Sequence, residues 1–340
     1  MTTRTLALCG CILVATLFRG VPALLSESRP REGIDIEQRV SQLQSLKWGL
    51  FVCWSFSTFS DKEWTPGIKD VSFFSPTGAD TDQWAKTAKE AGMGYILFLT
   101  KHHDGFCLWN TKTTERKVTR SPLGKDVLAQ VKKSCDKYGL KLALYFSEGD
   151  WNWPGAEDGK SRKGGSNPTL KQAQLRELLT QYGSIEFIWF DHAVGDGGLS
   201  HAETVSFVKS LQPGCFAGFN SGSPAGDLRL GEMGHPTPLS DPSGAGFNKE
   251  HIQGYTGYQL AEFTMPILMG TKAGRWFYTN PENDGVVLPV EQIVQLYRDG
   301  VKHGNIFSLD VGPNRAGKLR EIDVKTLKEV GRRIREVGDR

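Results

Sequence analysis

Side chains suited to acid–base chemistry follow short apolar runs at several points of this 340-residue sequence. Glu148 and Asp191 each come shortly after such a run, and Glu232 lies in the loop after a third. The pair His102-His103 follows another run. Glycoside hydrolysis needs two carboxyl groups placed around an anomeric carbon, and sugar hydroxyls need polar partners. These residue types therefore meet the requirements of glycoside hydrolysis.

Each of these residues also has a purely structural interpretation. Adjacent histidines in a strand point to opposite faces, so one of His102 and His103 could belong to the core. Asp191 could cap a helix, and Glu148 could be a solvated loop charge. A metal site is a further alternative, but no third ligand stands at a usual spacing, and we expect neither metal nor cofactor. The order of all these residues along the chain, rather than any one of them, favours function.

Strand-like and helix-like segments alternate in a way that would position these residues. Apolar runs predict strands at residues 49–54, 95–100, 141–146, 185–190, 215–219 and 305–309. Amphipathic patterns predict helices at residues 82–91, 126–138, 169–182, 201–211, 290–302 and 322–337. Short unalternating strands between helices are typical of parallel strands buried on both faces. A (β/α)8 barrel and a doubly wound sheet both satisfy this pattern.

The number of repeats favours the barrel, and no G-x-G-x-x-G motif opens a helix after a strand. We therefore predict an α/β fold of the (β/α)8-like TIM-barrel type. In such a barrel the active site lies at the C-terminal ends of the strands, where the residues above would meet. Residues 221–261 are rich in Gly, Pro and Ser and are expected to form long functional loops.

The N-terminal residues have the layout of a secretory signal peptide. Arg4 precedes an apolar run at residues 6–18, and Ala23 offers a small residue for cleavage. The run is shorter than the roughly 20 residues of a membrane-spanning helix, although an uncleaved anchor is an alternative. We expect a signal peptide at residues 1–23, a linker at 24–35 and a catalytic barrel at 36–340, in a secreted or periplasmic protein. No later stretch is long and apolar enough to span a membrane.

Charge and cysteine content narrow the expected partners. The formal net charge is +3 and falls to +1 when Arg4 and Arg19 leave with the signal peptide, since residues 1–23 hold no acids. Such a balance points to neither nucleic acid nor an anionic membrane as a partner.

Four cysteines remain when the signal peptide is removed. They allow three disulfide pairings and match no zinc motif, and we expect mostly buried thiols. These are Cys53, Cys107, Cys135 and Cys215.

Several segments resemble glycoside hydrolase family 29, the α-L-fucosidases. The most specific is 101–106 (KHHDGF) with Leu108-Trp109. Supporting segments are 47–51 (KWGLF), 84–86 (WAK), 90–92 (EAG), 144–147 (LYFS) and 189–191 (WFD). The resemblance covers most of residues 45–310. It implies a (β/α)8-like barrel and hydrolysis with retention of configuration.

The resemblance also implies catalytic roles. Asp191 would be the nucleophile that forms a covalent glycosyl-enzyme. Glu232, at the end of segment 227–232 (DLRLGE), resembles the general acid/base of some members. Glu262 is the alternative acid/base, and Glu148 is a third. The acid/base should lie about 5–5.5 Å from the nucleophile and carry a pKa raised by burial.

Substrate-binding roles follow from the same resemblance. His102 and His103 would bind fucose hydroxyls, with Trp64 beside them. Tyr145 and Trp189 match other pocket positions. Trp276 belongs to an aromatic segment that would hold the C5 methyl group of fucose.

The chain departs from the family pattern at three points. Cys53-Trp54-Ser55 replaces the usual His-Trp-Gly, so a weakly donating thiol stands where an imidazole is expected. The arginine expected after Asn220 is absent, and Arg229 is the candidate to replace it. Many members also carry a C-terminal β-sandwich, which we do not expect here.

The leading hypothesis is a retaining exo-acting hydrolase that releases terminal α-L-fucose from glycans. One alternative is a fucose-binding protein with weakened catalysis. Another is a hydrolase for a different sugar, such as an α-galactoside or a modified fucose. The expected partner is a fucosylated glycan or glycoconjugate, and the sequence leaves the linkage and the oligomeric state open.

Overall fold

The computed structural model describes residues 1, 34–60, 62–151, 167–191, 197–220, 222–241, 257–269, 276–278, 281 and 284–338. The chain divides into two units, Met1–Gly33 and Ile34–Arg340. Apart from Met1, the predicted signal peptide lies outside the described residues, as does the predicted linker except for residues 34 and 35. Within the described part, no helix is long and apolar enough to cross a membrane.

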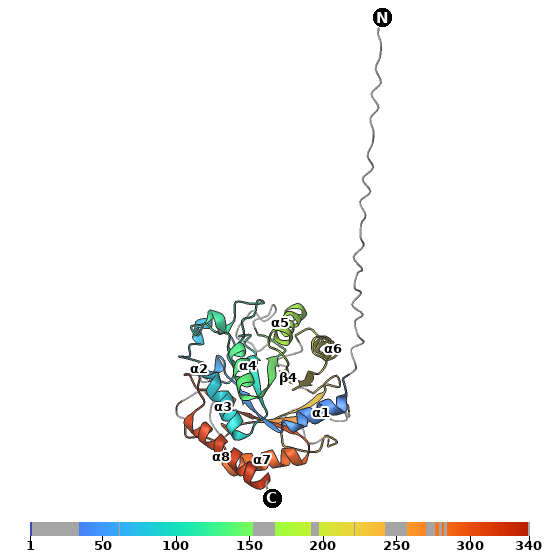
Figure 1. The fold of residues 1–340 in the computed structure, drawn as a ribbon. Coiled ribbons are helices and arrows are strands. Elements are labelled where there is room, and N and C mark those ends of the chain that lie inside the picture. Colours follow the sequence, from blue (N-terminus) through green and yellow to red (C-terminus); the bar gives the residue numbers. More distant parts are fainter. Residues whose placement is uncertain are drawn as a thin grey trace. The chain divides into compact units, whose positions relative to one another are not determined.

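Eight parallel strands close into a barrel in chain order, and β1 pairs with β8 to complete the ring. Helices surround the strands (Figure 1). The strands are β1 Trp48–Val52, β2 Tyr95–Lys101, β3 Lys141–Ser147, β4 Phe187–Asp191, β5 Phe216–Phe219, β6 Leu228–Glu232, β7 Leu260–Pro266 and β8 Ile306–Asp310. The strands are almost wholly buried because helices cover them outside and side chains fill them inside. The predicted barrel is confirmed.

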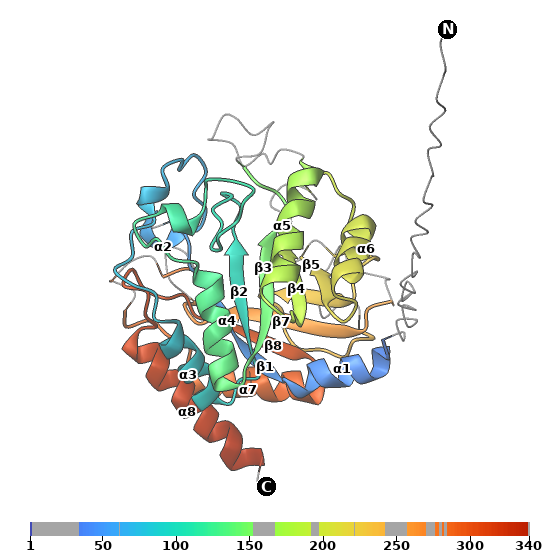
Figure 2. The ribbon, with the colours of Figure 1, turned by 45° about the horizontal axis from the view of Figure 1, so that its top comes forward.

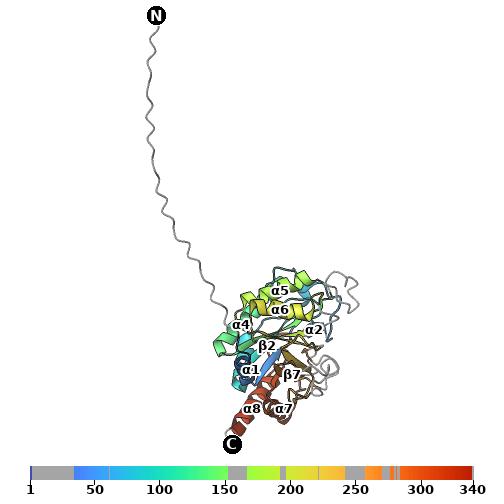
Figure 3. The ribbon, with the colours of Figure 1, turned by 90° about the vertical axis from the view of Figure 1, so that its right-hand side faces the viewer.

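Helices cover the outside of the barrel. They are α1 Ile36–Ser45, α2 Ser57–Ser60, α3 Thr81–Ala91, α4 Val127–Tyr138, α5 Pro168–Gln181, α6 His201–Leu211, α7 Val290–Lys302 and α8 Glu321–Gly338, with 3₁₀ turns η1 Val71–Phe73 and η2 Val118–Arg120. Helix α4 packs against β2 and β3 (Figure 2). Helices α7 and α8 lie side by side (Figure 3).

Local signals explain where two of these helices begin and end. Asp80 and Asp126 each accept a hydrogen bond from a backbone N–H in the first turn of α3 and α4. Gly92 and Gly139 end the same helices with φ of 83° and 67°, a left-handed conformation that glycine adopts without strain. The sequence therefore predicts these boundaries closely.

One expectation about the fold is wrong. Residues 221–261 were expected to be loops, yet β6 occupies 228–232 and β7 begins at Leu260. Strand β6 pairs with β7 in parallel over its whole length but with β5 through the single pair Gly218 and Leu228. Two features hide β6 in the sequence. Its main pairing partner, β7, lies about thirty residues further along the chain, and the Gly, Pro and Ser residues around β6 are typical of loops.

Candidate active site

The C-terminal ends of the strands surround a cavity of about 290 Å³. Its wall is formed by Phe51, Cys53, Glu63, Trp64, Leu99, His102, His103, Tyr145, Trp151, Trp189, Asp191, Asn220, Glu232, Met233, Trp276 and Phe277. Eight of the ten residues expected in the site line this cavity. The other two, Arg229 and Glu262, do not.

Asp191 is the last residue of β4 and is partly exposed to the cavity. The Tyr145 hydroxyl donates to its Oδ2 at 2.6 Å, and the Asn220 Nδ2 donates to its Oδ1 at 3.1 Å. The His103 Nε2 lies 3.5 Å from Oδ2. These neighbours hold the carboxylate in a fixed orientation at the cavity wall.

Glu232 is the last residue of β6 and shares a partner with Asp191. The Nδ2 of Asn220 donates to Glu232 Oε2 at 2.7 Å and to Asp191 Oδ1 at 3.1 Å. These two carboxylate oxygens therefore lie at most about 5.8 Å apart, the sum of the two hydrogen-bond lengths. This upper limit is compatible with the roughly 5–5.5 Å that separates the two carboxyl groups of retaining glycosidases.

Both histidines line the cavity, and neither is a core residue. The register between β2 and β3 shifts between Leu99 and Lys101, which ends the regular alternation of side chains just before His102. The two imidazoles lie 4.2 Å apart between ring centroids. His103 Nδ1 is 2.8 Å from the Ser147 hydroxyl.

His102 is 5% exposed, and its Nδ1 is buried without a hydrogen-bond partner in the described part of the chain. Burial and the neighbouring His103 lower the pKa of His102 well below its usual value. The imidazole is therefore neutral at physiological pH.

Aromatic rings form much of the remaining wall. Tyr145 and Trp189 stack with centroids 5.5 Å apart, and Phe51 lies 6.3 Å from Trp276. Trp64 is 39% exposed, so its indole offers a face to solvent beside the cavity. The cavity thus combines apolar surfaces with a cluster of polar groups, as small-molecule sites do.

Strand register explains why Glu232 reaches the cavity and Glu262 does not. Glu232 pairs with Thr264 of β7, whereas Glu262 pairs with Leu230 of β6. Glu262 therefore sits two residues lower along the strands, about 7 Å further from the C-terminal rim. Its carboxylate accepts hydrogen bonds from Trp189 and Thr264 inside the barrel.

Arg229 is directed away from the cavity. It lies between Leu228 and Leu230 on β6, and side chains alternate between the two faces of a strand. Its guanidinium donates to Thr237 and to the carbonyl oxygens of residues 238, 239 and 241. Arg229 thus stabilises the segment after β6 rather than lining the site.

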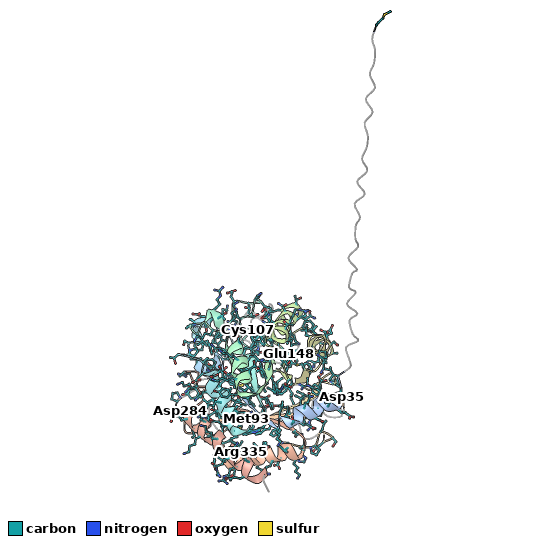
Figure 4. All side chains as sticks on the ribbon, viewed as in Figure 1. Asp35, Met93, Cys107, Glu148, Asp284 and Arg335 are labelled. Atoms are coloured by element: carbon teal, nitrogen blue, oxygen red, sulfur yellow. The ribbon has the colours of Figure 1, made fainter. Side chains whose placement is uncertain are left out.

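Glu148, labelled in Figure 4, lies just after β3 and does not line the cavity. The carboxylate is fully buried, with Lys171 Nζ at 2.7 Å and His201 Nε2 at 3.1 Å. Its backbone N–H donates to the carbonyl oxygen of Asp191 at 2.7 Å. Glu148 therefore ties the end of β3 to the end of β4.

Cys53 lines the cavity at the position where the family pattern has an imidazole. Burial, together with the nearby Asp310, raises the pKa of the thiol well above its usual value, so the group stays protonated. Cys53, Cys107, Cys135 and Cys215 are all buried free thiols.

Asn220 lines the cavity but was not among the residues expected in the site. It follows β5 directly, just as Asp191 ends β4, so the same positional rule identifies it. Its role depends on reaching two carboxylates from different strands, which no local pattern reveals.

A closed parallel barrel with a cavity and paired carboxyl groups at its C-terminal rim has the architecture of a TIM-barrel enzyme. Residues 37–339 match the family model described as alpha-L-fucosidase, and the chain belongs to this family, glycoside hydrolase family 29. The resemblance seen in the sequence is thereby confirmed.

Individual relatives agree with this assignment. The chain is 29% identical to alpha-L-fucosidase 1 of Arabidopsis thaliana over 84% of its own length and 58% of that protein. It is 26% identical to alpha-L-fucosidase isoenzyme 1 of Paenibacillus thiaminolyticus, with a TM-score of 0.71 over 89% of this chain and 77% of that one. A glycoside hydrolase 29 family member from an unknown rumen bacterium gives 27% identity and a TM-score of 0.71, over 87% and 56%. The chain thus spans less than two thirds of the Arabidopsis relative.

Proposed function

We propose that this protein is a retaining exo-acting α-L-fucosidase in which Asp191 is the nucleophile and Glu232 the general acid/base. The observation that carries the proposal is the shared amide of Asn220, which keeps oxygens of the two carboxyl groups within about 5.8 Å. Retaining glycosidases need such a close pair, whereas inverting enzymes need room for a water between the carboxyls.

The reaction proceeds in two displacements. Asp191 attacks the anomeric carbon while Glu232 donates its proton to the leaving glycosidic oxygen, which releases the aglycone and leaves a glycosyl ester on Asp191. Glu232, now a carboxylate, takes a proton from water, and the resulting hydroxide attacks the same carbon. Free fucose leaves, and both carboxyl groups return to their starting states.

The rest of the cavity supports sugar binding. His102 lines the cavity as a neutral imidazole, which can donate and accept hydrogen bonds to sugar hydroxyls. Trp276 and Phe51 form an apolar wall suited to a methyl group. A cavity of about 290 Å³ lies at the small end of ligand sites, which favours one terminal sugar over an internal chain segment.

Hydrolysis of a chromogenic aryl α-L-fucoside tests the proposal. Asp191→Ala should lower kcat by several orders of magnitude, and Glu291→Gln, an exposed carboxylate on α7, serves as the control. Glu232→Ala should regain turnover when azide is added, because a small nucleophile needs no general base. Near wild-type activity of Asp191→Ala, or no turnover by the wild type, would refute the assignment.

Cys53 favours a second candidate, a different or modified sugar. A protonated thiol is a weak hydrogen-bond donor, so the position contributes little to the recognition of a hydroxyl. Competition of L-fucose, D-galactose and O-methylated fucose against the aryl fucoside distinguishes these cases. Binding of L-fucose without any hydrolysis would instead indicate a sugar-binding protein.

We also propose that residues 1–23 direct export. Expression of the full chain followed by N-terminal sequencing of the exported protein tests this. A mature protein starting at residue 24 would support cleavage, and one retaining the apolar segment would support an anchor.

A further inference from the structure

Glu262 on β7 (Leu260–Pro266) is a buried acid that takes no part in the proposed reaction. It is 2% exposed and lies behind the cavity wall, in contact with the cavity-lining Trp189. A carboxyl group inside a barrel is costly to bury and needs hydrogen-bond donors. Its surroundings therefore indicate what it does.

The carboxylate of Glu262 accepts hydrogen bonds from three strands. Trp189 Nε1 on β4 donates at 3.0 Å, and Thr264 Oγ1 on β7 donates at 2.6 Å. The Ser308 hydroxyl on β8 is a third donor and lies 2.8 Å from the Tyr95 hydroxyl. No lysine or arginine of the described chain forms an ion pair with this carboxylate, so hydrogen bonds alone fix its position.

A continuous set of contacts leads from this acid to the proposed nucleophile. The indole of Trp189 stacks on Tyr145, with centroids 5.5 Å apart and planes 19° apart. The Tyr145 hydroxyl donates to Asp191 Oδ2 at 2.6 Å. Rotation of the indole would therefore displace the phenol ring and, with it, the donor that orients Asp191.

We propose that Glu262 is a positioning residue, whose carboxylate holds the Trp189 indole in place and thereby fixes Tyr145 against Asp191. The functional part of this inference rests on the proposed role of Asp191, whereas the contact with Trp189 stands by itself. Glu262 does not line the cavity, so it has no path to the leaving oxygen as an acid/base.

Burial raises the pKa of Glu262 to about 7, so the carboxyl changes charge near neutral pH. Two other ionisable side chains lie close by. Tyr95 on β2 faces the carboxyl group of Glu262, and Tyr145 on β3 faces the indole of Trp189. Burial raises the pKa of both phenols well above the usual value. Its register neighbours, Leu230 on β6 and Ile306 on β8, do not titrate.

A spectroscopic experiment tests the contact without reference to activity. The nine tryptophans are labelled with 5-fluorotryptophan, and the Trp189 fluorine resonance is assigned as the one missing from Trp189→Phe. We expect this resonance to shift with a midpoint near pH 7 in the wild type and to lose that shift in Glu262→Gln. A shift that persists in Glu262→Gln would overturn the coupling.

Kinetics test whether the contact serves the reaction. Glu262→Gln keeps an acceptor for the indole and should stay within about 3-fold of the wild-type kcat, whereas Glu262→Met leaves the indole N–H unpaired and should lose about 10-fold or more. The effects of Glu262→Met and Trp189→Phe should be less than additive, because one acts through the other.

Three results would overturn the proposal. The first is a folded Glu262→Met variant with wild-type kcat. The second is full additivity with Trp189→Phe. The third is a Glu262→Gln variant that loses activity only on substrates with poor leaving groups, which would make Glu262 the general acid. If Glu262→Met does not fold, the fluorine titration of Glu262→Gln still tests the contact between Glu262 and Trp189. A wild-type protein without activity would refute the proposed function but not this contact.

Discussion

The hydroxyl of Tyr145 donates a hydrogen bond of 2.6 Å to Oδ2 of Asp191. Burial raises the pKa of this phenol well above its usual value, and the adjacent carboxylate raises it further. Tyr145 therefore remains protonated at neutral pH and remains a donor. This donor holds Asp191 Oδ2 in a fixed position, which suits the proposed nucleophile.

Tyr145→Phe should lower kcat by roughly 10- to 100-fold, since a hydrogen bond to a charged group contributes about 1.5–3 kcal/mol. Tyr182→Phe is a matched control: it removes a 2.8 Å hydrogen bond to Asp126 away from the cavity and should leave kcat unchanged. Equal effects of the two variants would contradict the role of Tyr145.

Asn220→Asp should impair turnover more than Asn220→Ala. The amide donates to both Asp191 and Glu232, so Asn220→Ala removes one donor, whereas Asn220→Asp also places a third carboxylate between them. Both variants should lower kcat/KM for aryl fucoside hydrolysis, and Asn220→Asp should lower it further. Equal activity of the two variants would show that a charge at this position is without effect.

Lys171→Met should destabilise the fold by about 3–5 kcal/mol, because it removes the lysine cation from the fully buried Glu148 and leaves only the His201 imidazole beside that carboxylate. Denaturant unfolding at neutral pH measures the change. The exposed pair Lys86 and Glu90 provides the control, since Lys86→Met should cost less than about 1 kcal/mol. Adding Glu148→Met to Lys171→Met should recover part of the loss, and no recovery would argue against an uncompensated buried charge.

Glu262 should make the fold less stable as pH rises. Its pKa is about 7 in the folded protein against an ordinary value of 4.5, so the folded state holds the proton more tightly than the unfolded state. The free energy of unfolding should then fall between pH 4.5 and 7 by up to about 3 kcal/mol, with no further loss above pH 7. Glu262→Gln removes this contribution, so the difference between the two proteins isolates it. A difference that does not vary with pH would contradict the raised pKa.

Much of this architecture could be predicted from local patterns. Residues 95–100 and 141–146 predict strands because apolar side chains run without alternation, and Asp80, Gly92 and Gly139 mark helix ends through their own backbone contacts. The segment around His102 and His103 predicts the family. These signals are local because each depends on neighbours within a few residues.

The tertiary structure decided the roles of residues whose partners are distant in sequence. Glu232 and Glu262 were both candidates for the acid/base, and only the register of β6 against β7 separates a rim position from an interior one. Arg229 was expected in the site, but the alternation of side chains along β6 directs it away from the cavity. Asn220 belongs to the site because its amide contacts carboxylates on two other strands. The order of residues along the chain determines which side chains lie near the C-terminal ends of the strands. Strand register, and the face of the strand on which each side chain lies, determine which of them come into contact.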